Sequence, residues 1–345
     1  KGCYIQLEKK AQEYVLENIR TGFDRKDGLI ARIASFTEDT GKPLTLTNFV
    51  EHYELNLQAI YKKGCSFARL CVMAGKREDF SEELESDKFT KALARVALID
   101  SRHWIEFILN SFANLDSLKP ENLSLLEKRM LRMLQFTIWQ KDYQDCGFSD
   151  ELDGLRKIKS CKVLYDELIE VLKYSYNKID FIDKALMLDF DCPLNVYCNY
   201  SRDQIFAALD VNNPLSIREG VKFIADKKLD VLLNTLNKSS KQYSPTTMYN
   251  DYSINEWLFH WQSQSTTSAE SPTGQRYINH KKLGSKVLLF VRENKKDMYG
   301  NAETYTFLGT VNYVKHDGSN PMNIIWKLDN PIPAKFLKKT NKLVI

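Results

Sequence analysis

The spacing of apolar residues divides the chain into a helical first part and a strand-rich last part. From Leu7 to about Lys238, apolar positions recur every three or four residues, which is typical of helices that bury one face. After Tyr249, short apolar or alternating runs are separated by Gly, Asn, Asp and Pro. The pattern predicts an α+β protein, with a mainly helical N-terminal region followed by a small mixed β-barrel or twisted-sheet C-terminal domain.

The last part of the chain contains five predicted strands, at 258–264, 286–292, 304–308, 311–315 and 323–328, with turns at 299–301 and 317–320. Successive side chains of a strand point to opposite faces. Phe259, Trp261 and Ser263 therefore share one face, and His260, Gln262 and Gln264 share the other. We expect Trp261 in the core and the polar side chains away from it.

The boundary between the two parts is less sharp than the change of pattern suggests. Ser201 is the predicted N-cap of a short helix, and 229–236 fits a strand or a helix. The family resemblance described below implies that this segment belongs with the C-terminal domain, which gives a helical accessory region at 1–195 and a C-terminal α+β or β-barrel domain at 196–345.

Within the helical region, residues 44–64 have the spacing of a helix-turn-helix. Thr45 or Thr47 can cap a first helix that runs through Tyr53, and Asn56 can cap a second that runs through Lys62. The second helix could present four polar side chains to a DNA major groove: Gln58, Tyr61, Lys62 and Lys63. Two helices joined by a short turn are also a common element of helical domains, so both readings stay open.

Charge is distributed unevenly along the 345 residues. The net charge is +4, but from Val196 onward there are 20 Lys and Arg against 13 Asp and Glu, a net charge of +7. The C-terminal domain is therefore the better candidate for binding a polyanion, although a solvated basic surface explains the excess nearly as well.

Several other features bound the class of protein. A chain of this length predicts two or three domains, and its composition is that of a globular protein. No apolar run approaches the roughly 18 to 20 residues that cross a bilayer, so we expect no membrane partner and a cytoplasmic protein. The chain begins with Lys1 and its first Met is Met73, so we expect a piece of a longer protein. The seven Cys form no CxxC pair, and we expect no metal or other cofactor in this piece.

The densest polar chemistry lies between residues 243 and 278. Aromatic rings can stack a base, Gln amides can pair with its edge, and Arg can hold a phosphate. The candidate nucleic-acid-binding residues are His260, Gln262, Gln264, Arg276 and Tyr277, with the pairs Lys281, Lys282 and Lys295, Lys296 as phosphate contacts. The alternative is a rigid hairpin with a turn-forming loop at 272–274. His260 or His280 could act as a general base, but no matching nucleophile accompanies either, and we predict no catalytic residue.

The same stretch carries a family resemblance. Its run Phe259-His260-Trp261-Gln262-Ser263-Gln264-Ser265, together with further motifs, resembles the C-terminal region of bacterial superfamily II DEAD/DEAH-type helicases that have an N-terminal phospholipase-D-like nuclease and a C-terminal domain of unknown function. The further motifs lie at 244–249, 271–277, 286–292, 306–309 and 321–322 with Trp326, and weaker ones at 2–7 and 44–75.

The resemblance implies a bacterial protein that acts on DNA in repair or phage defence, with the helicase core and nuclease domain of the same polypeptide as partners. This piece has no phosphate-binding GxxxxGK[ST] loop and no DExx box, and His280 and Lys282 supply only half of a phospholipase-D motif. ATP binding and hydrolysis would therefore belong to the full-length helicase. We expect this piece to recognise DNA, including a modified or flipped base. The alternative is a protein-interaction or autoinhibitory module without direct DNA contact.

Overall fold

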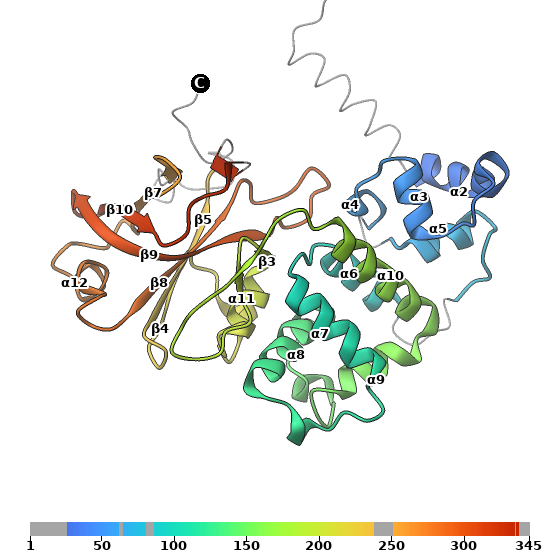
Figure 1. The fold of residues 1–345 in the computed structure, drawn as a ribbon, viewed down its shortest axis with the longest axis horizontal. Coiled ribbons are helices and arrows are strands. Elements are labelled where there is room, and N and C mark those ends of the chain that lie inside the picture. The colour runs from blue at the N-terminus through green and yellow to red at the C-terminus, as the bar shows by residue number, and fades with distance from the viewer. Residues whose placement is uncertain (1–25, 62–64, 81–85, 238–250, 335, 338–345) are drawn as a thin grey trace, which may run out of the picture. The chain divides into compact units, whose positions relative to one another are not determined.

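The computed structural model describes residues 26–61, 65–80, 86–237, 251–334 and 336–337 (Figure 1). The chain forms two compact units, one of 1–97 with 156–177 and the other of 98–155 with 178–345. Helices dominate the N-terminal part and a mixed sheet dominates the C-terminal part, which confirms the α+β prediction. The domain boundary predicted between residues 195 and 196 stays a prediction, and both residues lie in the second unit. No described helix is long and apolar enough to cross a membrane.

The first unit is built from helices of 4 to 17 residues that bury apolar side chains. Their apolar side chains are spaced three or four residues apart, as the sequence pattern requires. In α2, for example, Leu29, Ile33 and Phe36 are buried. The helices of this unit are α2 (Lys26–Thr40), α3 (Leu46–His52), α4 (Leu57–Ile60), α5 (Phe67–Met73), α6 (Ser86–Val96) and α10 (Lys162–Lys178). The boundary between the two units also crosses α9 (Asp153–Ser160), whose residues from Arg156 onward belong to the first unit.

The helix caps predicted in the segment 44–64 are present. The Thr45 side chain accepts a hydrogen bond from the backbone N–H of Asn48, and the Asn56 side chain accepts one from Gln58. These bonds satisfy N–H groups that a helix leaves without partners at its first turn. The second helix, α4, is a single turn that ends at Ile60, shorter than the recognition helix of a major-groove reader.

The second unit combines a helical part with the sheet. Its helices are α7 (Arg102–Ala113), α8 (Leu125–Ile138), α11 (Arg202–Ala208) and α12 (Pro272–Asn279). Ser201 caps α11 as predicted, and the Gln204 side chain returns a bond to the Ser201 N–H, which completes a capping box. In Figure 1, α7 and α8 lie beside α11 at one end of this unit, and α12 lies at the other end.

The sheet is open. Its strand order is β4-β5-β8-β9-β10-β7-β6, with β3 also paired to β9, and only β5 and β8 are parallel. The bounds are β3 (Asn199–Tyr200), β4 (Val221–Ile224), β5 (Leu229–Thr235), β6 (Tyr252–Ser253), β7 (Leu258–Gln262), β8 (Lys286–Arg292), β9 (Tyr305–Asp317) and β10 (Asn323–Leu328), and β1 (Lys184–Ala185) pairs separately with β2 (Asn195–Val196).

The twisted-sheet form of the fold prediction is confirmed, and the barrel form is wrong. The long strand β9 pairs with β8 through its first half and with β10 through its second half, so the two flanks of the sheet are displaced along it. The end strands β4 and β6 do not pair with each other. A barrel needs that last pairing to close.

One face of the sheet carries the main core of the unit, and α12 packs on it. Tyr277 of α12 lies against Trp261 of β7 and Trp326 of β10, with ring centroids 5.4 and 6.2 Å apart. On the opposite face, the rings of Phe290 and Phe307 stack with centroids 4.4 Å apart. Both faces of the central strands are therefore covered, and their polar chemistry is confined to strand ends and edges.

Candidate functional site

The strand ends surround a cavity of about 340 Å³ in the second unit. The beginning of β4, the ends of β5, β7 and β8, and the beginning of β9 contribute to its wall. We call it the sheet-end cavity. Its polar lining comprises three arginines, three amides, two acids and a threonine: Arg202, Arg218, Arg292, Asn234, Gln262, Gln264, Glu219, Asp251 and Thr235. Trp261 and Tyr305 add aromatic surface.

The cavity holds an excess of positive charge, three guanidiniums against two carboxylates. Asp251 is buried and accepts a hydrogen bond from the Gln262 backbone N–H at 3.0 Å. Hydrogen bonds from its own N–H and from that of Arg218 lower the pKa of Glu219, which therefore stays ionised near neutral pH. The remaining positive charge suits an anionic ligand.

The amide groups add hydrogen-bonding capacity beside the arginines. Gln262 donates from Nε2 to Oδ1 of Asn323 at 3.1 Å, which fixes its amide orientation on β7. Gln264 follows the end of β7 and is exposed. Amides with both donors and acceptors can match the edge of a nucleobase.

The predicted alternation along β7 is confirmed. Phe259 and Trp261 are buried, whereas His260 and Gln262 are half-buried on the other face. His260 stacks on Tyr252 of the neighbouring strand, with ring centroids 4.7 Å apart and an angle of 14° between the planes. Gln262 and Gln264 line the cavity together with Trp261 of the opposite face, because the cavity lies at the end of the strand. His260 and its partner Tyr252 do not line it.

Arg276 and Tyr277 lie elsewhere, because α12 covers the core face of the sheet. Tyr277 is 2% exposed and packs against two tryptophans, so its predicted ligand contact is corrected to a core role. Arg276 donates to both carboxylate oxygens of Asp230 at 2.8 and 2.9 Å. The alternative reading, a hairpin with a turn-forming loop at 272–274, is wrong at this point, because Ser271 caps a helix there with Pro272 in its first turn. Neither Arg276 nor Tyr277 lines the sheet-end cavity.

The predicted lysine pairs stay predictions. Lys281 and Lys282 follow α12 directly and are exposed, and Lys295 and Lys296 are exposed in the connection between β8 and β9. None of the four lines the sheet-end cavity.

The residues predicted for a helix-turn-helix contact lie in the first unit. Tyr61 is buried and donates from its hydroxyl to Glu167 at 2.8 Å, so its predicted contact with DNA is corrected to a structural bond. Gln58 is half-buried and donates to the carbonyl of Ala97 at 3.2 Å. Lys62 and Lys63 lie outside the described residues.

Sequence reasoning missed the three arginines of the sheet-end cavity. They are far apart in the chain, and each stands alone among uncharged or acidic neighbours, so a search for charge clusters passes over them. A signal was present for Arg292, because it ends a predicted strand whose other residues are mostly apolar. For Arg202 and Arg218 the sequence offers no comparable signal.

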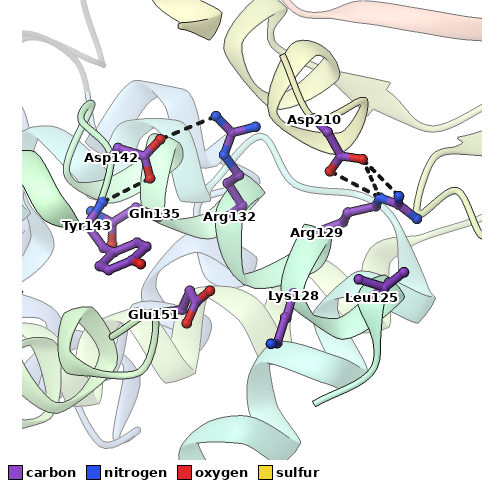
Figure 2. Close-up of a pocket in the computed structure, with 9 residues that line it drawn as sticks. All are labelled: Leu125, Lys128, Arg129, Arg132, Gln135, Asp142, Tyr143, Glu151 and Asp210. Atoms are coloured by element: carbon purple, nitrogen blue, oxygen red, sulfur yellow. Dashed lines mark hydrogen bonds and ion pairs between the residues drawn. The ribbon is translucent and has the colours of Figure 1, made fainter. Parts of the chain in front are cut away.

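A second cavity, of about 330 Å³, lies in the helical part of the same unit (Figure 2). Its charged lining is balanced, with Lys128, Arg129 and Arg132 against Asp142, Glu151 and Asp210. Figure 2 shows Arg129 extending to Asp210 and Arg132 to Asp142, at 2.8 and 3.3 Å. Both arginines also donate to backbone carbonyls next to α11 or in the segment before it. These contacts attach α8 to its neighbours, and we assign them a structural role.

The described residues contain no group of three His, Cys, Asp or Glu side chains that could hold a metal ion.

Comparison with known proteins identifies one domain. The model of a family described as Domain of unknown function (DUF3427) matches residues 194–339, a range that includes the whole sheet-end cavity. No curated protein matches the chain. The resemblance to an unknown-function C-terminal domain is thus confirmed, and the chain carries a DUF3427 domain at 194–339.

Proposed function

We propose that residues 196–345 recognise DNA through the sheet-end cavity, as the C-terminal accessory part of a bacterial helicase–nuclease. The observation that supports the proposal most directly is that Gln262 and Gln264 line the same cavity as three arginines. The two glutamines were singled out from the sequence for base recognition, and the arginines add the phosphate-binding chemistry that such a site needs.

The size of the cavity limits what can enter it. At about 340 Å³ it lies near the lower end of the range of small-molecule sites. A duplex cannot enter, but one extruded or single-stranded nucleotide can. The proposal is therefore recognition of a single nucleotide, flipped from a duplex or within a single strand, with the amides of Gln262 and Gln264 on the base edge.

The biological setting of the proposal rests on the family resemblance. ATP binding, strand separation and nuclease activity would belong to other domains of the same polypeptide, in DNA repair or phage defence in the cytoplasm. The sheet-end cavity would deliver the recognised nucleotide or strand to them.

The test is fluorescence-anisotropy binding of labelled single-stranded, double-stranded and base-modified DNA across a salt series. We expect affinity that falls steeply with salt, because lysines and arginines displace counterions from phosphates. Gln262→Ala and Gln264→Ala should each weaken binding by about tenfold, the cost of about one good base contact. Gln144→Ala, which removes an exposed glutamine amide outside the cavity, is the matched control and should bind as the parent does.

The outcome against the proposal is the absence of binding to every DNA at low salt. That result would favour the alternative, a docking or autoinhibitory module, which predicts binding to the helicase core with little dependence on Gln262 or Gln264.

A further inference from the structure

Arg202 and Arg292 approach the same buried phenol from two sides. Arg202 donates from Nη2 to the Tyr305 hydroxyl at 3.2 Å. The guanidinium carbon of Arg292 lies 4.4 Å from the centroid of the Tyr305 ring. Tyr305 is 1% exposed, so its position is fixed by packing. Two half-buried cations are thereby held around one rigid side chain at the wall of the sheet-end cavity.

Neutral acceptors fix both guanidiniums. Arg202 donates from Nη1 to the carbonyls of Ile217 and Arg218 at 3.1 and 2.6 Å. Arg292 donates from Nε to the Thr235 hydroxyl at 2.9 Å and from Nη1 to the Glu303 carbonyl at 3.1 Å. These bonds orient the two groups without neutralising their charge, and Nη2 of Arg292 has no hydrogen-bond partner among the described residues.

Other arginines of the second unit show that this arrangement is unusual for the chain. Arg102, Arg129, Arg132 and Arg276 each have an aspartate oxygen within 4.0 Å. Within the described part of the chain, neither Arg202 nor Arg292 forms an ion pair with a carboxylate. The charges of Glu219 and Glu303 act on Arg202 and Arg292, respectively, without a direct ion pair. Holding two like charges together without a carboxylate in contact is unfavourable where water is partly excluded. An anion from outside the chain would supply a counter-charge in direct contact with both.

We propose that Arg202 and Arg292 form a phosphoryl-binding subsite of the sheet-end cavity. Planar guanidiniums match the oxygens of a phosphate, and fixed ones lose little entropy on binding it. The inference rests on the proposed function in one respect, because it takes the phosphate to be that of the nucleotide whose base meets Gln262 and Gln264. Arg218, exposed at the rim, adds a third positive charge, whereas Asp251 and Glu219 disfavour an anion on their side of the cavity.

The first arm of the test measures small ligands by calorimetry in a phosphate-free buffer of low salt. The probes are a deoxynucleoside, its 5′-monophosphate and inorganic phosphate. We expect the monophosphate to bind at least about tenfold more tightly than the nucleoside, and Arg292→Gln and Arg202→Gln each to remove that advantage, as loss of a charge-assisted bond implies. Lys315→Gln removes one exposed charge of β9 outside the cavity and should leave that advantage unchanged.

Arg292→Lys keeps the charge but not the planar fork, and should bind the monophosphate with intermediate affinity. Intermediate binding by this variant would show that loss of binding in Arg292→Gln is not caused by misfolding. Thermal melting of each variant checks the fold directly. Equal binding of nucleoside and monophosphate by the parent protein, or equal binding of the monophosphate by parent and Arg292→Gln, would overturn the inference. Binding of inorganic phosphate alone, with no nucleotide or DNA affinity, would identify a free-phosphate site.

The second arm keeps the two proposals distinguishable by measuring DNA with the same variants. DNA binding by the parent protein that survives both Arg202→Gln and Arg292→Gln would reject the phosphoryl subsite and leave DNA recognition standing. Monophosphate binding that depends on the arginines, without any DNA binding, would retain the subsite and reject the proposed function.

Discussion

Arg276 and Asp230 form a two-point ion pair that joins α12 to β5. Nε and Nη2 of Arg276 lie 2.8 and 2.9 Å from the two carboxylate oxygens of Asp230, whose side chain has no exposed surface. The guanidinium also lies over the ring of Phe223, 3.9 Å from its centroid. Burial raises the pKa of Asp230, and the bonds from Arg276 oppose that rise. The pair therefore holds a helix on the sheet and compensates a buried charge.

The first prediction concerns this pair. Arg276→Ala should lower the free energy of unfolding by about 3 kcal/mol, because it leaves the Asp230 carboxylate buried without its partner. Replacing both residues, as Arg276→Gln with Asp230→Asn, should cost less than the two single changes added together. Urea unfolding followed by tryptophan fluorescence measures both.

Arg218→Ala is the matched control, because it removes an exposed arginine from the same unit. It should change stability by less than about 0.5 kcal/mol. If Arg276→Ala were as stable as Arg218→Ala, the ion pair would have no structural role and Arg276 would again be a candidate for ligand contact.

The second prediction concerns the buried carboxylate of Glu167 in the first unit. It accepts hydrogen bonds from the backbone N–H groups of Phe67 and Ala68 at 2.7 and 2.8 Å, and from the Tyr61 hydroxyl. Glu167 thereby satisfies the first turn of α5, where an acid is favourable. Glu167→Ala should destabilise the protein by about 3 kcal/mol, because three buried donors lose their acceptor.

Glu167→Gln keeps one acceptor oxygen and should cost less than Glu167→Ala. Asp166→Ala is the control on the neighbouring position, since Asp166 is exposed and pairs with exposed Lys162. Denaturant unfolding of the three variants measures their free energies of unfolding, which should rise in the order Glu167→Ala, Glu167→Gln, Asp166→Ala. Equal stability of Glu167→Ala and Asp166→Ala would contradict the assigned role.

The third prediction follows from the close approach of two backbone segments at α12. A Cβ added to Gly274 would lie 2.0 Å from the carbonyl oxygen of Ser268. Gly274→Ala should therefore cost about 2 kcal/mol or more, since the backbone must shift. Thr273→Ala, one residue earlier in the same helical turn, should change stability by less than about 0.5 kcal/mol. Thermal melting compares the two, and an unchanged melting temperature for Gly274→Ala would show that the loop can move aside.

Much of the sheet was predictable because local rules decide it. Strands β8 and β10 begin and end where the alternation and turn residues place them, and β7 falls within the predicted segment. The two segments predicted on either side of Gly309 form the single strand β9. Gly309 has φ of 91°, and the pairing register with β8 shifts between Leu289 and Phe290, so the glycine marks a bulge within a strand.

The site was less predictable, because it depends on which distant strand ends meet. Gln262 and Gln264 were found because their own segment is rich in polar chemistry. The cavity arginines come from the start of α11, the loop before β4 and the end of β8, and only the folded sheet brings them together. No helix was predicted at 272–279, so the position of Arg276 on α12, where it pairs with Asp230, was not predictable from its own segment.

The last prediction concerns pH and Asp100, which joins the helical part of the second unit to its sheet. Its carboxylate accepts hydrogen bonds from the backbone N–H and the side-chain amide of Asn199 at 2.7 and 2.5 Å, and Asn199 accepts one from Thr306 of β9. Burial raises the pKa of Asp100 to about 7, although the bonds from Asn199 oppose that rise.

A raised pKa means that the folded protein holds a proton that the unfolded chain releases near pH 4. The stability contributed by protonated Asp100 is therefore complete below about pH 4 and is lost as pH rises through about 7. The total loss is about 4 kcal/mol on the scale of about 1.4 kcal/mol per pKa unit. Asp100→Asn cannot ionise, so it should lack this part of the pH dependence.

Urea unfolding of the parent and Asp100→Asn between pH 4.5 and pH 8.5 measures the difference. Other buried acids, including Glu167, also have raised pKa values and the same sign, and subtracting the two profiles removes their contribution. The parent should lose stability relative to Asp100→Asn as pH rises, whereas Asp145→Asn, which changes an exposed acid, should follow the parent. Parallel profiles for the parent and Asp100→Asn would mean that Asp100 is ionised throughout, held as a carboxylate by Asn199.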